Sequence, residues 1–118
     1  EIVKSLSEVH LNYLSLIFLC KQTKMNGINS IESLKEHCEY ICAKMPVTNG
    51  IESSIPFLYM LRLLTISLGS AADVYSKRYN LDIDKVKEIL PLAMNSIPGD
   101  YSLTPVGIII AIINIRNK

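Results

Sequence analysis

The sequence predicts an all-α fold, a compact bundle of five or six helices around a central apolar helix at about residues 56–68. Apolar residues recur at three- and four-residue spacing over several stretches, and turn-forming residues separate these stretches. At 118 residues the chain has the usual size of one domain. We therefore expect one helical domain over residues 1–118, which can be a piece of a longer chain because it opens at Glu1 without a methionine.

The first two helices follow from apolar spacing and from their stop signals. Over residues 5–24, one helix face carries Leu6, Val9, Tyr13, Leu14, Ile17 and Cys20. This helix ends near Gly27, since glycine readily takes the left-handed conformation that closes a helix. Asn29 and Glu32 have the spacing of a capping box, so a second helix begins there, and Pro46 stops it.

The third helix is expected to be the core of the bundle. Residues 56–68 are apolar nearly all round, with Arg62 as their only charge. Gly69-Ser70 interrupts the pattern, and residues 71–79 resume it as a kinked continuation or as a separate short helix. Asp82 can cap a further helix that ends near Leu90, because the following Pro91 cannot continue the hydrogen bonding.

The last segment, residues 104–115, carries two opposing signals. Thr104-Pro105 is a good helix opening, whereas valine and isoleucine favour strands. No obvious second strand is available for pairing, and Arg116 and Lys118 suit a helix carboxyl end. We therefore predict a helix here.

Composition limits the possible partners. The net charge of +1 provides no broad field for nucleic acid or an anionic membrane, and the apolar stretches fall short of the roughly 20 residues of a membrane span. Hydrophobic residues form 49% of the chain, more than the short helices can cover, so we expect a partner chain to cover the rest. The three cysteines have no disulfide-framework spacing, which favours the reducing cytoplasm.

The sharpest candidate for chemistry is the group formed by His37, Cys38 and Cys42. Thiolates four residues apart on one helix face can ligate zinc, with His10 or Cys20 as further ligands. Cysteine on an apolar helix face acts more commonly as a small hydrophobe, so core packing is the preferred interpretation. A Cys–His pair stays open as an enzymatic alternative, and a reactive Cys42 would be its first sign. We predict no enzyme, no cofactor and no metal.

The favoured function is that of a non-enzymatic protein-interaction module: an adaptor, an inhibitor or immunity-type protein, or a subunit of an assembly. It would self-associate through the apolar faces of the first, third and last helices. Tyrosine and arginine contribute strongly to interfaces, so the predicted contact residues are the aromatic and charged side chains near the helix breaks, Tyr75, Arg78, Tyr79 and Tyr101.

The alternative is a small DNA-binding regulator. Residues 70–107 can form a helix-turn-helix, with the basic residues Lys77, Arg78, Lys85 and Lys87. The run Leu103-Thr-Pro-Val-Gly107 is similar to the end of the wing in winged-helix DNA-binding domains. Asp82, Asp84 and Glu88 lie among these lysines and would repel phosphates, which makes DNA binding the second choice.

Overall fold

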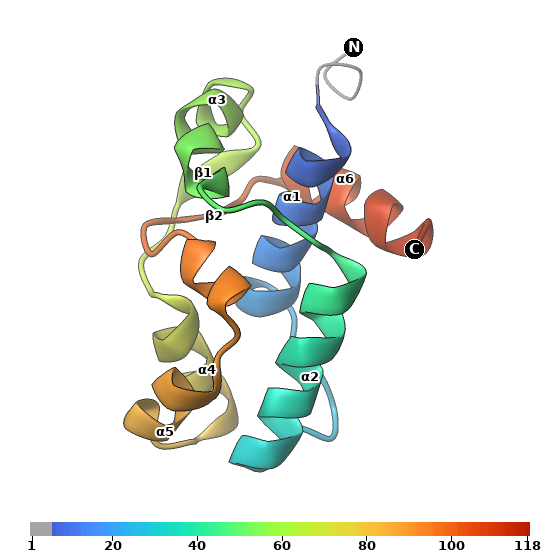
Figure 1. The fold of residues 1–118 in the computed structure, drawn as a ribbon. Coiled ribbons are helices and arrows are strands. Elements are labelled where there is room, and N and C mark those ends of the chain that lie inside the picture. Colours follow the sequence, from blue (N-terminus) through green and yellow to red (C-terminus); the bar gives the residue numbers. More distant parts are fainter. Residues whose placement is uncertain (1–5) are drawn as a thin grey trace.

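A computed structural model describes residues 6–118 (Figure 1). Most of the described chain is helical, and the prediction of a small all-α bundle is confirmed. A two-stranded sheet accompanies the helices. The elements are α1 (Glu8–Lys21), α2 (Ile31–Lys44), the 3-10 helix η2 (Ile51–Ser54), α3 (Ile55–Met60), β1 (Leu64–Ile66), α4 (Ala71–Tyr79), α5 (Ile83–Ile89), the 3-10 helix η3 (Leu92–Ser96), β2 (Tyr101–Leu103) and α6 (Pro105–Arg116).

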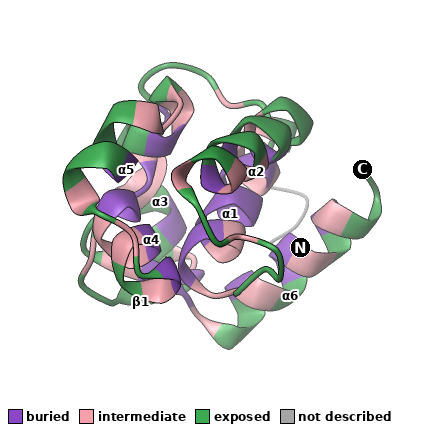
Figure 2. Ribbon diagram, turned by 90° about the horizontal axis from the view of Figure 1, so that it is seen from below, coloured by how far each residue is buried: buried purple, intermediate pink, exposed green. Residues whose placement is uncertain are grey.

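The central element is α1, not the predicted helix at 56–68. The side chains of Leu14, Leu16 and Ile17 have no exposed surface, and α1 contacts α2, α4, α6 and β2. Figure 2 shows α1 as a buried helix between α2, α4 and α6. A helix with apolar residues on all sides is suited to this position.

The predicted helix at 56–68 is broken after one and a half turns. The Leu63 amide donates to the Leu58 carbonyl at 3.1 Å, and the Arg62 amide donates to the Tyr59 carbonyl at 2.9 Å. Arg62 has a φ of 61°. These bonds form a Schellman helix end, which most commonly places glycine where Arg62 stands. The residues that follow extend as β1.

The two-stranded sheet is not among the elements that the sequence predicts. β1 pairs antiparallel with β2, with Leu64 opposite Leu103 and Ile66 opposite Tyr101. Thr104 then caps α6 by accepting from the Gly107 amide at 3.2 Å, so the predicted last helix is confirmed. Gly107 is required because a Cβ there would collide with the Leu63 carbonyl oxygen.

α1 begins at Glu8 and ends at Lys21, inside the predicted range of residues 5–24 and short of the predicted end near Gly27, and α2 begins with a different cap from the predicted one. Ser30 caps α2, with Ser33 in the third helical position, instead of Asn29 and Glu32. Asp82 caps α5 as predicted, and Ser70 caps α4 as a separate short helix. Between residues 6 and 118, no helix is both long and apolar enough to cross a membrane.

Candidate protein-interaction surface

Large apolar side chains are exposed on α3, on β1 and at Leu68, which lies two residues after β1. The exposed fractions are 45% for Tyr59, 80% for Met60, 69% for Ile66 and 81% for Leu68. We call these four residues the α3–β1 surface. Tyr59 and Met60 lie on α3 before the Schellman end, and Ile66 and Leu68 lie in the extended chain after it.

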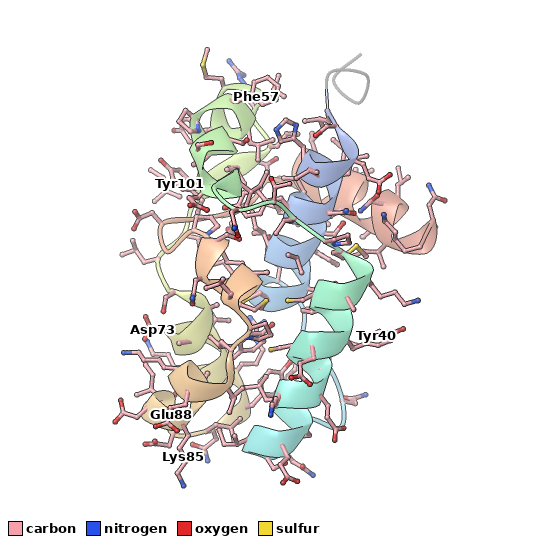
Figure 3. All side chains as sticks on the ribbon, in the orientation of Figure 1. Tyr40, Phe57, Asp73, Lys85, Glu88 and Tyr101 are labelled. Carbon is pink, nitrogen blue, oxygen red and sulfur yellow. The ribbon has the colours of Figure 1, made fainter. Side chains whose placement is uncertain are left out.

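A hollow of about 500 Å³ joins α3 to β1 within this surface. Its lining includes Tyr59 and Met60 from α3, Thr65 and Ile66 from β1, and Arg62 from the turn between them. The Tyr59 ring also lies 5.4 Å from the half-buried ring of Tyr101, measured between centroids. Tyr101 is therefore the one predicted contact residue that borders the α3–β1 surface (Figure 3).

The outer edge of β2 is closed by side chains from the carboxyl end of α1. The Gln22 amide imitates a third strand: its Nε2 donates to the Leu103 carbonyl at 3.1 Å, and its Oε1 accepts from the Leu103 amide at 2.7 Å. The buried Lys21 ammonium donates to the carbonyls of Tyr101 at 2.6 Å, Pro98 at 2.7 Å and Ser67 at 3.2 Å. Burial lowers the pKa of Lys21.

Arg78 holds this end of α1 in place. Its guanidinium donates to the carbonyl oxygens of Cys20 at 3.0 Å and Lys21 at 2.8 Å, and also to that of Thr23. The last carbonyls of a helix have no intrahelical donor, so a cation satisfies them well. The sequence placed Arg78 at an interface with a partner or with DNA, but its guanidinium is committed inside the molecule.

The outer edge of β1 has no partner strand in the described chain, and it is exposed at Ile66 but buried at Leu64, which is 3% exposed. The Thr104 amide donates to the Leu63 carbonyl at 3.0 Å, and the Ser67 amide donates to the Asp100 carbonyl at 2.8 Å. Backbone groups alternate in direction along an antiparallel pair, so those of Leu64 and Ile66 point away from β2. Among residues 6–118, no side chain donates to or accepts from these groups.

Tyr75 and Tyr79 are not exposed, which corrects the expectation that they lie on the surface. Tyr75 is fully buried, and Tyr79 is 9% exposed. They lie on the inner face of α4, which packs against α1, and the Tyr79 hydroxyl accepts from the Met25 amide at 2.9 Å. Burial, with the Cys20 and Cys38 thiols nearby, raises the pKa of Tyr75. Both tyrosines stabilise the core.

The group of His37, Cys38 and Cys42 lacks the features of a reactive site. Cys38 is buried, and burial raises the pKa of its thiol to about 12 and that of the Cys42 thiol to about 11. Burial also lowers the pKa of His37. A nucleophilic cysteine needs a lowered pKa, so these thiols are poor nucleophiles at neutral pH. Within the described part of the chain, no three His, Cys, Asp or Glu side chains are arranged to hold a metal ion.

A three-residue turn, residues 80–82, joins α4 to α5. Lys77, Lys85 and Lys87 are exposed on this segment, as are the acidic residues Asp82, Asp84 and Glu88. Figure 3 shows Lys85 and Glu88 at the far end of the molecule from Phe57. The residues similar to a wing end lie in β2 and the start of α6, and their strand pairs with β1, which precedes the helix pair.

A second apolar stripe runs along the outer face of α6. Val106, Ile109 and Ile113 are 49%, 59% and 54% exposed. The opposite face of α6 packs on α1, where the Asn114 amide donates to Ser15 Oγ at 2.9 Å and to Asn12 Oδ1 at 3.2 Å. All three residues of the stripe are less exposed than Met60, Ile66 and Leu68.

Comparison with known proteins gives a family match over most of the chain. A family model described as ":-like" matches residues 1–90. The chain belongs to this family. The matched range includes every element from α1 to α5, and β2 and α6 lie beyond it. No curated protein and no solved structure matches the chain.

Proposed function

We propose that the protein is a self-associating, non-enzymatic protein-interaction module, a subunit of an assembly, and that it makes contact through the α3–β1 surface. The observation that carries the proposal is the exposure of four large apolar side chains within residues 59–68, a segment with Arg62 as its only charge. Contiguous exposed apolar side chains commonly mark protein interfaces. An adaptor or an inhibitor would use the same surface toward a different protein.

The burial of side chains leaves fewer candidate surfaces for self-association than the three helices that the sequence suggests. The apolar side chains of α1 are buried or half-buried against the rest of the molecule, so they are not free to contact a second copy. The remaining candidates are the α3–β1 surface and the stripe on α6. Met60 and Leu68 are each more exposed than any residue of that stripe, which favours the α3–β1 surface.

Light scattering coupled to size-exclusion chromatography tests the proposal, with samples over a wide concentration range at low and high salt. We expect a dimer or larger species that persists at high salt, because apolar contacts are not screened. Met60→Asp and Leu68→Asp should each give a monomer. Leu92→Asp is the matched control, since Leu92 is 76% exposed on η3, outside the surface.

Two outcomes would contradict the proposal. A wild-type protein that is monomeric at every concentration would remove self-association altogether. A dimer that is disrupted by Ile113→Asp and not by Met60→Asp would place the contact on α6.

DNA binding is the second candidate, favoured by the three-residue turn between α4 and α5. The exposed acidic residues on α5 weigh against it. If the protein binds DNA, a fluorescently labelled duplex should bind with an affinity that falls steeply as the salt concentration rises. The double variant Lys85→Ala, Lys87→Ala should bind the duplex more weakly than the wild type at the same salt concentration. Salt-independent or absent binding would contradict this function.

For the setting of the protein, we propose the reducing cytoplasm and a function that requires no cofactor. All three cysteines are free thiols, and two of them are buried in the core. Free thiols of this kind are typical of a reducing compartment.

A further inference from the structure

We propose that a cavity between α2 and the carboxyl ends of α1 and α6 binds a small carboxylate with an apolar body. This site is separate from the proposed self-association, because no residue of the α3–β1 surface lines the cavity.

The cavity has a volume of about 230 Å³, and side chains from three helices form its apolar wall. Leu19 belongs to α1, Ile41 to α2 and Ile115 to α6. Met25, from the segment after α1, and Met45, at the end of α2, complete this wall. Ile41 and Met45 are buried, whereas Met25 is exposed. The cavity therefore has an apolar interior and opens to solvent.

The volume limits the size of the ligand. An apolar cavity of about 150 Å³ holds one benzene molecule, so this cavity suits a body of about ten non-hydrogen atoms. A ring with a short side chain or a chain of about eight carbons has this size. Nucleotides, peptides and long-chain lipids are too large to enter it whole.

The polar side chains at the cavity favour an anion. Lys44 and Lys118 line it, and none of its described lining residues is acidic. Lys118 Nζ lies 3.6 Å from Glu8 Oε2, whereas Lys44 has no carboxylate partner among residues 6–118. The Lys44 ammonium lies 5.5 Å from the centroid of the Tyr40 ring, and Figure 3 shows Tyr40 projecting outward from α2. Burial lowers the pKa of His37, so this residue adds no charge at neutral pH.

Together, the apolar wall and the lysine match a ligand with one apolar part and one negative charge. Burial of the apolar part supplies most of the affinity, and the charge fixes its orientation, with the carboxylate at the solvent side next to Lys44. A neutral apolar molecule would leave Lys44 unpaired. A phosphate group carries up to two charges and a stronger hydration shell, which one exposed lysine replaces poorly.

Titration with sodium octanoate, which has ten non-hydrogen atoms, tests the site. The protein carries labelled methyl groups, and NMR follows their shifts at octanoate concentrations too low for micelles. We expect saturable binding with a dissociation constant below about 1 mM, as is usual for a ligand of this size. The largest shifts should occur at Ile41, Met45 and Ile115, and those at Met60 and Leu68 should be small.

A lysine variant tests the carboxylate contact. Lys44→Gln should weaken octanoate binding about threefold to fivefold, because an exposed ion pair contributes modestly. It should leave the affinity for 1-octanol, which carries no charge, unchanged. Lys35→Gln is the matched control: Lys35 is exposed on the same helix but does not line the cavity, so this variant should bind octanoate like the wild type. Circular dichroism checks that both variants are folded.

Three results would overturn this inference. Octanoate that produces no saturable shift would show that the cavity takes no such ligand. Shifts at Met60 and Leu68 as large as those at Ile115 would show unspecific binding to exposed apolar side chains. Equal octanoate affinities of Lys44→Gln and Lys35→Gln would show that Lys44 does not bind the carboxylate. A monomeric wild-type protein contradicts the proposed function only, since the cavity lies within one copy.

Discussion

The outward backbone groups of β2 have side-chain hydrogen-bond partners within the molecule, whereas those of β1 have none among the described residues. On β2, the side chains of Lys21 and Gln22 occupy the outward backbone groups, and the end of α1 replaces a third strand. On β1, the outward groups of Leu64 and Ile66 meet no side chain of the described chain, and apolar residues flank them. The comparison teaches that this fold satisfies the backbone of an edge strand where a helix end reaches it, whereas on β1 Leu64 is buried and Ile66 stays exposed.

Removing the charge that closes the β2 edge should have the largest effect. Lys21→Met leaves three carbonyl oxygens without their donor, and we expect a loss of about 3 kcal/mol in the free energy of unfolding. Urea unfolding followed by circular dichroism measures this loss. Lys24→Met is the control, because Lys24 is exposed near the same helix end. Equal stabilities of the two variants would show that Lys21 does not hold the edge.

Removing the Gln22 side-chain amide from the β2 edge should lower the free energy of unfolding by less than Lys21→Met does. Gln22→Met removes both hydrogen bonds to Leu103, and we expect a loss of about 1–2 kcal/mol in unfolding free energy. The newly open strand should also make the protein more prone to aggregate, which light scattering detects. Gln22→Glu retains only the acceptor and should fall between wild type and Gln22→Met. An unchanged stability for Gln22→Met would contradict the role of Gln22.

The titration of Lys21 should have the smallest effect on the free energy of unfolding. Burial lowers the pKa of Lys21 from its ordinary value of 10.5, so between the folded pKa and 10.5 the unfolded chain binds more protons than the folded protein. Stability should therefore rise with pH over that window in the wild type and lack this rise in Lys21→Met. Urea unfolding of both proteins in steps from pH 8 to 10 measures the difference. Parallel curves would show that Lys21 titrates normally.

Helices with clear periodicity and caps could be predicted from the sequence. Asp82 and Thr104 lie at the helix starts where the pattern places them. The run at 56–68 could not be predicted, because its helix ends at Arg62 in a left-handed conformation that usually requires glycine. The sheet depends on that break, since β1 exists only where the helix stops.

The candidate surface was harder to predict than the fold. Tyr75 was expected outside because it lies near a helix break, but the inner face of α4 carries it into the core. Lys21 and Gln22 gave no signal, since polar residues at a helix end normally face water. Their acceptors lie 46 to 81 positions away along the chain, and only the folded structure brings them together.

Amide hydrogen exchange of β1, measured residue by residue with NMR at several protein concentrations, tests the central claim most directly. We predict that the amide of Ile66, which is 69% exposed, exchanges rapidly in dilute protein and slows down as the concentration rises. The amides of Thr65 and Leu103 should be protected throughout, because each has an acceptor within its own copy. Exchange at Ile66 that does not change with concentration, in a protein that nevertheless dimerises, would contradict contact through the α3–β1 surface.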